Sequence, residues 1–298
     1  MSDAVLVLET GQTFPARRFG AGGEISAELV FTTAMVGYVE TLTDPSYHGQ
    51  IVVQTFPLIG NYGVMRADFE SDSPRLSAYI VRQHCEVPSN FRMEEDLDGY
   101  LKKSGVIGLY DIDTRALTRI IRETGVMNAA ILNEIPKDLP AFCKALKEKA
   151  LSSDVYAVTC PAPYAIGKGK RHVVLWDFGF KHGMAQAMID RGCRVTVVPA
   201  GITAEEILKL NPDGMLLSNG PGDPAVNFSI IQELKKLAES GVPIFGICLG
   251  HQLMALAMGA KTEKLKYGHR GANQPARYVK TDRQSTRLNS SHVALSRM

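Results

Sequence analysis

From residue 172 onward, short apolar runs alternate with segments of helical character. The expected strands are "HVVLWDFG", "CRVTVVPA", "GMLLSNG" and "VPIFGI", and the expected helices are "HGMAQAMIDRG", "TAEEILKL", "FSIIQELKKLAESG" and "HQLMALAMGA". This alternation predicts βαβ units and an open, mainly parallel sheet. In such sheets the active site lies at the carboxyl ends of the strands. The segments "SNGPGDP" and "CLGH" both follow strands, so they are expected to be neighbours in space.

The first half of the chain has a different pattern of apolar and turn-forming residues. Residues 1–150 contain short β-rich runs such as "AVLVLET", "ELVFTT", "QIVVQTF" and "AYIVRQ", separated by Gly, Pro and Asp. One helix is expected between Asp113 or Thr114 and Gly125, and another over 138–151. Residues 151–171 are rich in Pro, Gly and basic residues and are expected to form a linker. The fold class is therefore α/β, with a mixed β/α domain followed by a parallel-sheet domain.

Composition excludes several functional classes. The formal net charge of the 298 residues is +2, too small to indicate nucleic acid or an anionic membrane as partner. The five cysteines form no CxxC pair, which argues against a disulfide framework and against a zinc site. No apolar stretch of about 18 residues and no signal-peptide pattern occur. A soluble, cytoplasmic protein is expected.

The segment "GICLG" places Cys248 between Gly246 and Gly250, at the junction of a strand and a helix. This pattern is typical of a nucleophile elbow, in which a strained turn projects the nucleophile above the sheet. The positive end of the following helix is expected to favour the thiolate, and the Leu249 N–H can serve one side of an oxyanion hole. A buried cysteine in an ordinary strand-helix turn explains the pattern alone equally well.

The loop "SNGPGDP", residues 218–224, favours a nucleophile elbow over a buried cysteine in an ordinary turn. Glycines around a proline expose the backbone, and a second N–H donor for an oxyanion could come from Gly220 or Gly222. A plain Gly-Pro loop is the simpler alternative for this segment by itself. Its place one βα unit before the elbow, at the same expected sheet edge, favours a shared site.

The combination of "NGPGDP" and "PIFGICLGHQ" resembles the class I, triad-type glutamine amidotransferases. The resemblance implies glutamine hydrolysis through a cysteinyl thioester, with Cys248 as the nucleophile. It also implies that four residues surround the glutamine and its oxyanion: Gly220, Gly222, Leu249 and Gln252. His251 is expected to be structural, because this family takes its base from further along the chain.

The first half resembles the small subunit of carbamoyl-phosphate synthetase, through residues 31–63 and through "DTRALTR" at 113–119. The resemblance covers residues 4 to about 280. It implies that Ser46, in "TDPSY", contacts the glutamine; from the residues alone "TDPSY" is simply a turn.

The resemblance also implies that this chain forms a heterodimer with a large synthetase subunit. The heterodimer would be a ligase of arginine and pyrimidine biosynthesis. The large subunit would make carbamoyl phosphate from the released ammonia, bicarbonate and ATP, with Mg²⁺. This chain shows no Walker-type phosphate loop. Nucleotide binding is therefore expected on the partner, and no cofactor or metal is expected in this chain.

The end of the sequence departs from the family pattern. The family supplies its base and orienting acid as His-x-Glu downstream of the elbow. Here His251, His269 and His292 follow Cys248, and none has an acidic residue two places later. The amidotransferase domain is expected over 172–280, incomplete at its C-terminal end, with an atypical tail over 281–298. A truncated or chimeric reading frame and a natural variant that has lost hydrolysis are the two explanations.

Three functional hypotheses remain open. The first is the glutamine-hydrolysing subunit of carbamoyl-phosphate synthetase, impaired in the sequence as it stands. The second is a non-catalytic interaction subunit, and the third is a stand-alone cysteine hydrolase of the same sheet type. The first domain disfavours the third hypothesis.

Overall fold

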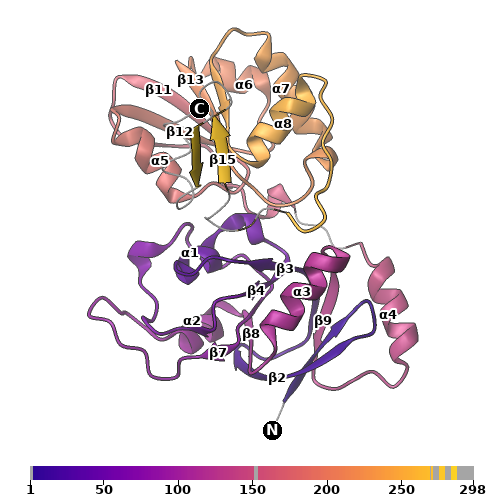
Figure 1. Cartoon of the computed structure of the whole chain (residues 1–298). Helices are drawn as coiled ribbons and strands as arrows, with labels where there is room; N and C mark the ends of the chain where they lie inside the picture. Colours follow the sequence, from indigo (N-terminus) through magenta and orange to yellow (C-terminus); the bar gives the residue numbers. More distant parts are fainter. Residues whose placement is uncertain (1–2, 151–153, 269, 271–274, 279–282, 287–298) are drawn as a thin grey trace. The chain divides into compact units, whose positions relative to one another are not determined.

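The computed structural model describes residues 3–150, 154–268 and 270, and the backbone of 275–278 and 283–286 (Figure 1). The chain divides into two compact units. The first contains Met1–Ser152 and Leu265–Met298, and the second contains Ser153–Lys264.

The first unit is built on a closed barrel of strands in the order β1-β2-β8-β6-β4-β3-β9. These strands are β1 (Ala4–Leu8), β2 (Thr13–Gly20), β3 (Ile25–Thr32), β4 (Gln50–Gln54), β6 (Ala78–Ile80), β8 (Ile107–Tyr110) and β9 (Met127–Leu132). Leu6, Leu29, Ile51 and Ile80 are fully buried in the core cluster of this barrel. Two short parallel strands, β5 (Leu58–Ile59) and β7 (Gln83–His84), form a separate small sheet.

The helices of the first unit are α1 (Tyr38–Thr43), α2 (Leu97–Ser104), α3 (Thr114–Thr124) and α4 (Leu139–Glu148), with 3-10 turns at Pro45–Tyr47 and Arg66–Asp68. Helix α3 begins where the sequence predicts, because the Asp113 side chain accepts a hydrogen bond from the Ala116 N–H. Gly125 ends it. Leu117 and Ile121 bury the inner face of α3 in the barrel cluster.

The second unit is an α/β layer structure whose sheet has the order β10-β12-β11-β13-β14. Its strands are β10 (Tyr164–Ile166), β11 (Arg171–Asp177), β12 (Cys193–Pro199), β13 (Gly214–Leu217) and β14 (Ile244–Gly246). All neighbouring strands are parallel except β10, which pairs antiparallel with β12. The predicted parallel sheet is therefore confirmed.

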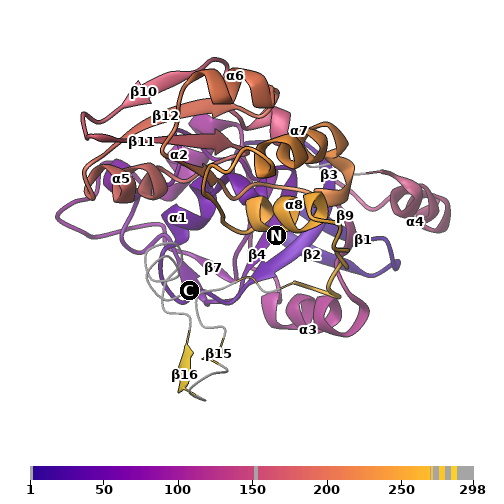
Figure 2. The same cartoon turned by 90° about the horizontal axis from the view of Figure 1, so that it is seen from above.

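Helices cover both faces of this sheet (Figure 2). They are α5 (His182–Ile189), α6 (Ala204–Lys209), α7 (Phe228–Ala238) and α8 (Leu249–Ala257), with 3-10 turns at Val155–Ala157 and Pro224–Val226. Trp176 packs in one cluster with residues of α6, α7 and α8, whereas its neighbour Leu175 packs in another with residues of α5. This alternation follows from the two-residue period of a strand. The Thr203/Glu206 capping box predicted for α6 is present.

Two boundaries differ from those expected. Part of the expected linker is strand β10, which extends the sheet because Tyr164–Ile166 pairs with the edge of β12 and Ile166 packs near α5. Residues from Leu265 onward belong to the first unit instead of the second. The Val126 N–H donates to the Lys266 carbonyl (2.9 Å), and the Tyr267 ring packs on Phe31.

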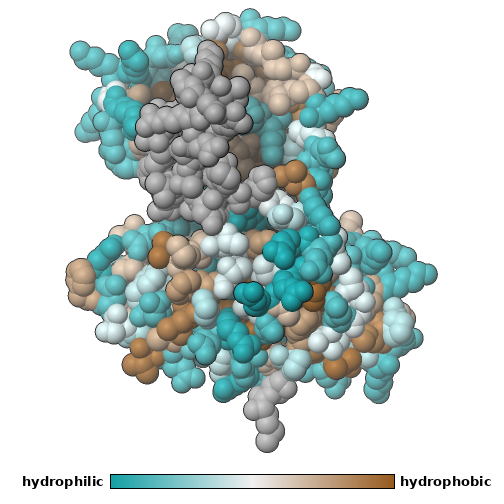
Figure 3. Space-filling view, in the orientation of Figure 1, coloured by the Kyte–Doolittle hydropathy of each residue, from teal (hydrophilic) through white to brown (hydrophobic). Residues whose placement is uncertain are grey.

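Part of the expected tail, at Arg283–Thr286, is strand β16, which pairs antiparallel with β15 (Pro275–Tyr278). The rest of the tail, including His292, lies outside the described residues, as does His269. Hydrophilic and hydrophobic residues are mixed over the visible surface of each unit (Figure 3). No helix in the portion searched is both long and apolar enough to cross a membrane.

Candidate active site

The turn between β14 and α8 has an uncommon backbone conformation. Cys248 has φ 51° and ψ −110°, and it directly precedes the first residue of α8. A positive φ is rare for any residue other than glycine and marks local strain. The Cys248 side chain is exposed, whereas its neighbour Leu249 is buried. The turn therefore presents the thiol to solvent, which argues against the alternative of a buried structural cysteine.

The two glycines of the elbow allow the strand and the helix to approach closely. A Cβ on Gly246 would lie 2.6 Å from the His251 backbone nitrogen, and one on Gly250 would lie 2.5 Å from the Leu217 carbonyl oxygen. Real Cβ atoms do not come so near to backbone atoms. Only glycine fits at these two positions, as the sequence predicts for a nucleophile elbow.

The loop after β13 lies against the elbow. A Cβ on Gly220 would lie 2.7 Å from the Leu249 side chain and 2.3 Å from the Phe178 carbonyl oxygen. The structure thus brings Leu249 together with Gly220, one of the two glycines expected to supply the second oxyanion donor. Neither residue's backbone N–H donates a hydrogen bond to another residue within the described part of the chain. Gly222, two residues on, is exposed and has φ 83°.

Of the remaining predicted residues, Gln252 and His251 lie on the elbow helix and Ser46 lies in the first unit. Gln252 and His251 are exposed in the first turn of α8, where the Gln252 N–H donates to the Cys248 carbonyl (3.0 Å). Ser46 lies in the first unit, in the predicted turn, which is the 3-10 helix Pro45–Tyr47. Its N–H donates to Asp44 Oδ1 (2.9 Å). The role of Ser46 toward glutamine stays a prediction.

Sequence reasoning missed two polar residues beside this site, Ser218 and Asp177. Both are buried, at 0% and 3% exposure, and both accept hydrogen bonds from backbone N–H groups of the loop that follows β11. A serine in "LSNG" and an aspartate in "WDFG" resemble ordinary loop residues. The available signal was their position at the carboxyl edge of the sheet, since Asp177 ends β11 and Ser218 directly follows β13.

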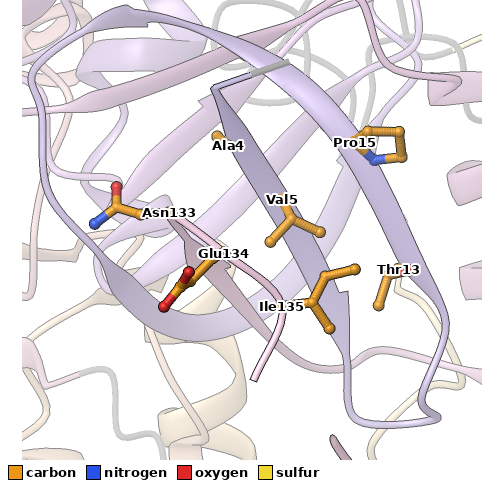
Figure 4. A pocket seen from close by; sticks show the side chains of 7 residues that line it. All are labelled: Ala4, Val5, Thr13, Pro15, Asn133, Glu134 and Ile135. Atoms are coloured by element: carbon orange, nitrogen blue, oxygen red, sulfur yellow. The ribbon is translucent and has the colours of Figure 1, made fainter. Parts of the chain in front are cut away.

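A pocket of about 270 Å³ lies elsewhere, in the first unit (Figure 4). It is lined by Ala4, Val5, Thr13, Pro15, Asn133, Glu134 and Ile135. Asn133 is already engaged, because its N–H donates to Glu24 and its side-chain oxygen accepts from Arg18. None of the residues that line this pocket is among those predicted to form the catalytic site. Across the part of the chain searched for metal sites, no cluster of three or more His, Cys, Asp or Glu could hold a metal ion.

Comparisons with known families and proteins match both units. The family "Carbamoyl-phosphate synthase small chain, CPSase domain" matches residues 6–131, and "Glutamine amidotransferase class-I" matches residues 174–296. The pyrimidine-specific small chain of carbamoyl phosphate synthase from Halalkalibacterium halodurans is 50% identical over 274 residues, covering 91% of this chain and 75% of the relative. This chain belongs to the carbamoyl phosphate synthase small-chain family.

Further relatives agree. The small chain of Bacillus thuringiensis subsp. konkukian is 47% identical, covering 98% of this chain and 84% of that relative. The pyrimidine-specific small chain of Bacillus subtilis is 50% identical, covering 93% of this chain and 76% of the relative. The amidotransferase match runs to residue 296, past residue 280 where the sequence likeness was expected to end. Among solved structures, an aminopeptidase from Aneurinibacillus sp. strain AM-1 aligns over 87% of this chain and 70% of its own, with a TM-score of 0.26 at 11% identity, from which nothing follows.

Proposed function

We propose that this small chain hydrolyses L-glutamine, with Cys248 as the nucleophile. The observation that carries the proposal is the exposed Cys248 at a strained elbow, with Gly220 and Leu249 packed beside it. The thiolate attacks the amide carbon, a C–S bond forms, and the carbonyl electron pair moves onto oxygen. Collapse of this intermediate breaks the C–N bond and releases ammonia once the nitrogen is protonated. Water then hydrolyses the thioester to glutamate and regenerates the thiol.

The surrounding residues have distinct roles in this proposal. The N–H groups of Leu249 and of Gly220 stabilise the oxyanion, since unpaired backbone donors aimed at developing charge lower the barrier. Gly222 and Gln252 contact the substrate from the second unit, and Ser46 contacts it from the first. No cofactor or metal takes part in the chemistry of this chain.

The ammonia passes to a large synthetase subunit, the partner that a small chain implies. There it reacts with bicarbonate and ATP, with Mg²⁺, to form carbamoyl phosphate for arginine and pyrimidine synthesis in the cytoplasm. Two of the relatives are pyrimidine-specific small chains, which supports the pyrimidine branch.

A second candidate is a non-catalytic interaction subunit that docks on the large subunit without hydrolysing glutamine. The observation that favours it is the histidine pattern after Cys248. His251, His269 and His292 all lack an acidic residue two places later, so no His-x-Glu follows Cys248 in these residues.

One experiment separates these candidates. Ammonia release from glutamine is measured for the chain and for Cys248→Ala, with and without a large subunit, and Cys248 labelling by a chloroketone analogue of glutamine is followed in parallel. Hydrolysis that falls by about 10³-fold or more in Cys248→Ala supports the first candidate. Glutamine-protected labelling without hydrolysis supports the second. A Cys248 that the chloroketone does not label would rule out a glutamine site at the elbow.

A further inference from the structure

Ser218 makes hydrogen bonds to three backbone segments of the candidate site: the loop after β11, the loop after β13 and the elbow. Its hydroxyl oxygen lies 2.9 Å from the Phe178 backbone nitrogen and 2.7 Å from the Asn219 carbonyl oxygen. Its own carbonyl accepts a hydrogen bond from the Gly250 N–H (3.0 Å), in the elbow. The Ser218 side chain is fully buried, so water does not compete for these bonds.

The direction of the two hydroxyl bonds follows from their partners. The Phe178 N–H can only donate, so the Ser218 oxygen accepts there. The hydroxyl hydrogen is then left for the Asn219 carbonyl, which can only accept, and 2.7 Å is an ordinary distance for such a bond. The hydroxyl therefore holds the Asn219 carbonyl in one orientation.

That carbonyl belongs to the same peptide unit as the Gly220 N–H. Because the peptide is planar and trans, fixing the carbonyl of Asn219 also fixes the Gly220 N–H, which points the opposite way. Glycine at position 220 offers little resistance to rotation of this peptide, since it lacks a Cβ. The hydroxyl bond therefore restricts a rotation that the glycine itself permits.

The other partner of the hydroxyl, the Phe178 N–H, belongs to a loop whose next two residues bond to Asp177. One carboxylate oxygen of Asp177 accepts from the N–H groups of Gly179 (2.8 Å) and Phe180 (2.9 Å), and the other accepts from Cys160 (2.7 Å). Asp177 is almost completely buried. The Ser218 hydroxyl is thus anchored to a fixed loop on one side and orients the Asn219–Gly220 peptide on the other.

We propose that Ser218 is a positioning residue, whose hydroxyl orients the Asn219–Gly220 peptide so that the Gly220 N–H serves as an oxyanion donor. This inference rests on the proposed glutamine site. Ser218 does not touch the substrate. It acts through Gly220, which packs against Leu249, the source of the other donor.

The test compares two reagents on Cys248. A chloroketone analogue of glutamine carries a carbonyl oxygen that needs the oxyanion donors, whereas iodoacetamide alkylates the thiol without the glutamine site. Ser218→Ala is expected to lower kinact/KI for the chloroketone by about 10-fold or more, given that loss of one oxyanion donor costs about 10²–10³-fold in turnover. The iodoacetamide rate is expected to change by less than about 2-fold, because the thiol itself is not altered.

Ser71→Ala is the matched control. Ser71 is also a buried serine, and its hydroxyl bonds to the carbonyls of Thr43 (2.6 Å) and Ser73 (3.1 Å) in the first unit. Its removal costs a comparable hydrogen bond, yet both labelling rates are expected to stay at the wild-type values.

Each outcome decides one point. If the wild-type chain is not labelled by the chloroketone, the proposed function fails, whatever Ser218 does. If the wild type is labelled and a folded Ser218→Ala is labelled equally fast, only the positioning role is overturned. Equal falls in the chloroketone and iodoacetamide rates also overturn it, because they indicate general disruption. Where Ser218→Ala does not fold, Ser218→Cys decides, with labelling read at Cys248 itself by peptide mass spectrometry because the new thiol can also be alkylated. Its weaker hydrogen bonds should give an intermediate loss with the chloroketone alone.

Discussion

At the scale of single residues, the position of Cys248 is imposed by backbone contacts on both sides of it. The Ile247 N–H donates to the Leu217 carbonyl (2.9 Å), and the Gly250 N–H donates to the Ser218 carbonyl (3.0 Å). A strained conformation costs on the order of 1–3 kcal/mol and persists only where its surroundings fix it. These two bonds, to the last residue of β13 and to the residue after it, provide that constraint.

Another residue whose environment has a measurable consequence is His84, in the first unit. Its ring stacks on Phe19 at 4.5 Å, and its Nε2 atom is buried without a hydrogen-bond partner among the described residues. Burial lowers the pKa of His84 below its usual value, although Asp98, Glu86 and Asp96 oppose this effect and Lys102 adds to it. The folded state therefore favours the neutral ring.

We expect the free energy of unfolding to fall as the pH drops through about 6.5, because the unfolded chain then binds a proton that the folded His84 resists. The contribution of His84 to the free energy of unfolding is complete above that pH. It decreases as the pH falls toward the lower pKa that His84 has in the folded state. His84→Phe keeps the ring stack without a titrating group, so urea unfolding at about pH 7.5 and about pH 5.5 should show a smaller difference than in the wild type.

The control is His251→Gln, since His251 is exposed on α8. It should keep the wild-type difference between the two pH values. An equal pH dependence for His84→Phe and the wild type would contradict the assignment.

At the scale of elements, the contact of α8 with β13 depends on Gly250. Helix propensity alone predicts that Gly250→Ala stabilises α8 by about 1 kcal/mol. The new Cβ, however, would lie 2.5 Å from the carbonyl oxygen of Leu217, a backbone atom that cannot move without shifting the strand. We expect packing to dominate, with a net loss of about 1–3 kcal/mol in the free energy of unfolding, measured with urea.

Gly214→Ala, at the start of β13, is the matched control for this glycine. The nearest atom to its new Cβ is the Pro243 carbonyl oxygen at 3.5 Å, an ordinary contact. Its stability should be equal to that of the wild type or slightly higher. If Gly250→Ala is as stable as Gly214→Ala, then α8 can move away from β13 without loss of stability, which would contradict the prediction.

The elements could largely be predicted from the sequence, because their signals are local. The period of Ile230, Ile231, Leu234 and Leu237 predicts α7, and all four are buried there. Closure of the barrel could not be predicted in this way. It depends on β9 pairing with both β1 and β3, contacts between distant segments that no local pattern encodes. Strand β10 was missed because prolines and glycines flank it.

The candidate site, too, could be predicted only where the signal is local. The glycines and Cys248 carry their chemistry in their spacing, so the elbow could be predicted. Ser218 and Asp177 could not, because their role arises from hydrogen bonds to loops that fold up around them. A buried hydroxyl in a strand-end loop becomes informative only when its partners are known.

At the scale of the whole molecule, the chain contributes to the first unit twice, before and after it forms the second. Residues 265–268 pack on the barrel through Tyr267, whose ring centroid lies 5.9 Å from that of Phe31. The Lys266 carbonyl accepts from the Val126 N–H, directly after α3. The stability of the first unit therefore depends on a segment that lies more than a hundred residues further along the chain than the helix it contacts.

Tyr267→Ala tests this dependence. Loss of the ring contact and of part of the buried area should lower the stability of the first unit by about 1–2 kcal/mol. Since the Val126 amide is protected by Lys266, its hydrogen exchange should accelerate by about 5- to 30-fold, the factor to which that free energy corresponds. Tyr156→Ala is the control, because Tyr156 is 48% exposed in the second unit. Unchanged exchange at Val126 in Tyr267→Ala would mean that this segment does not stabilise the barrel.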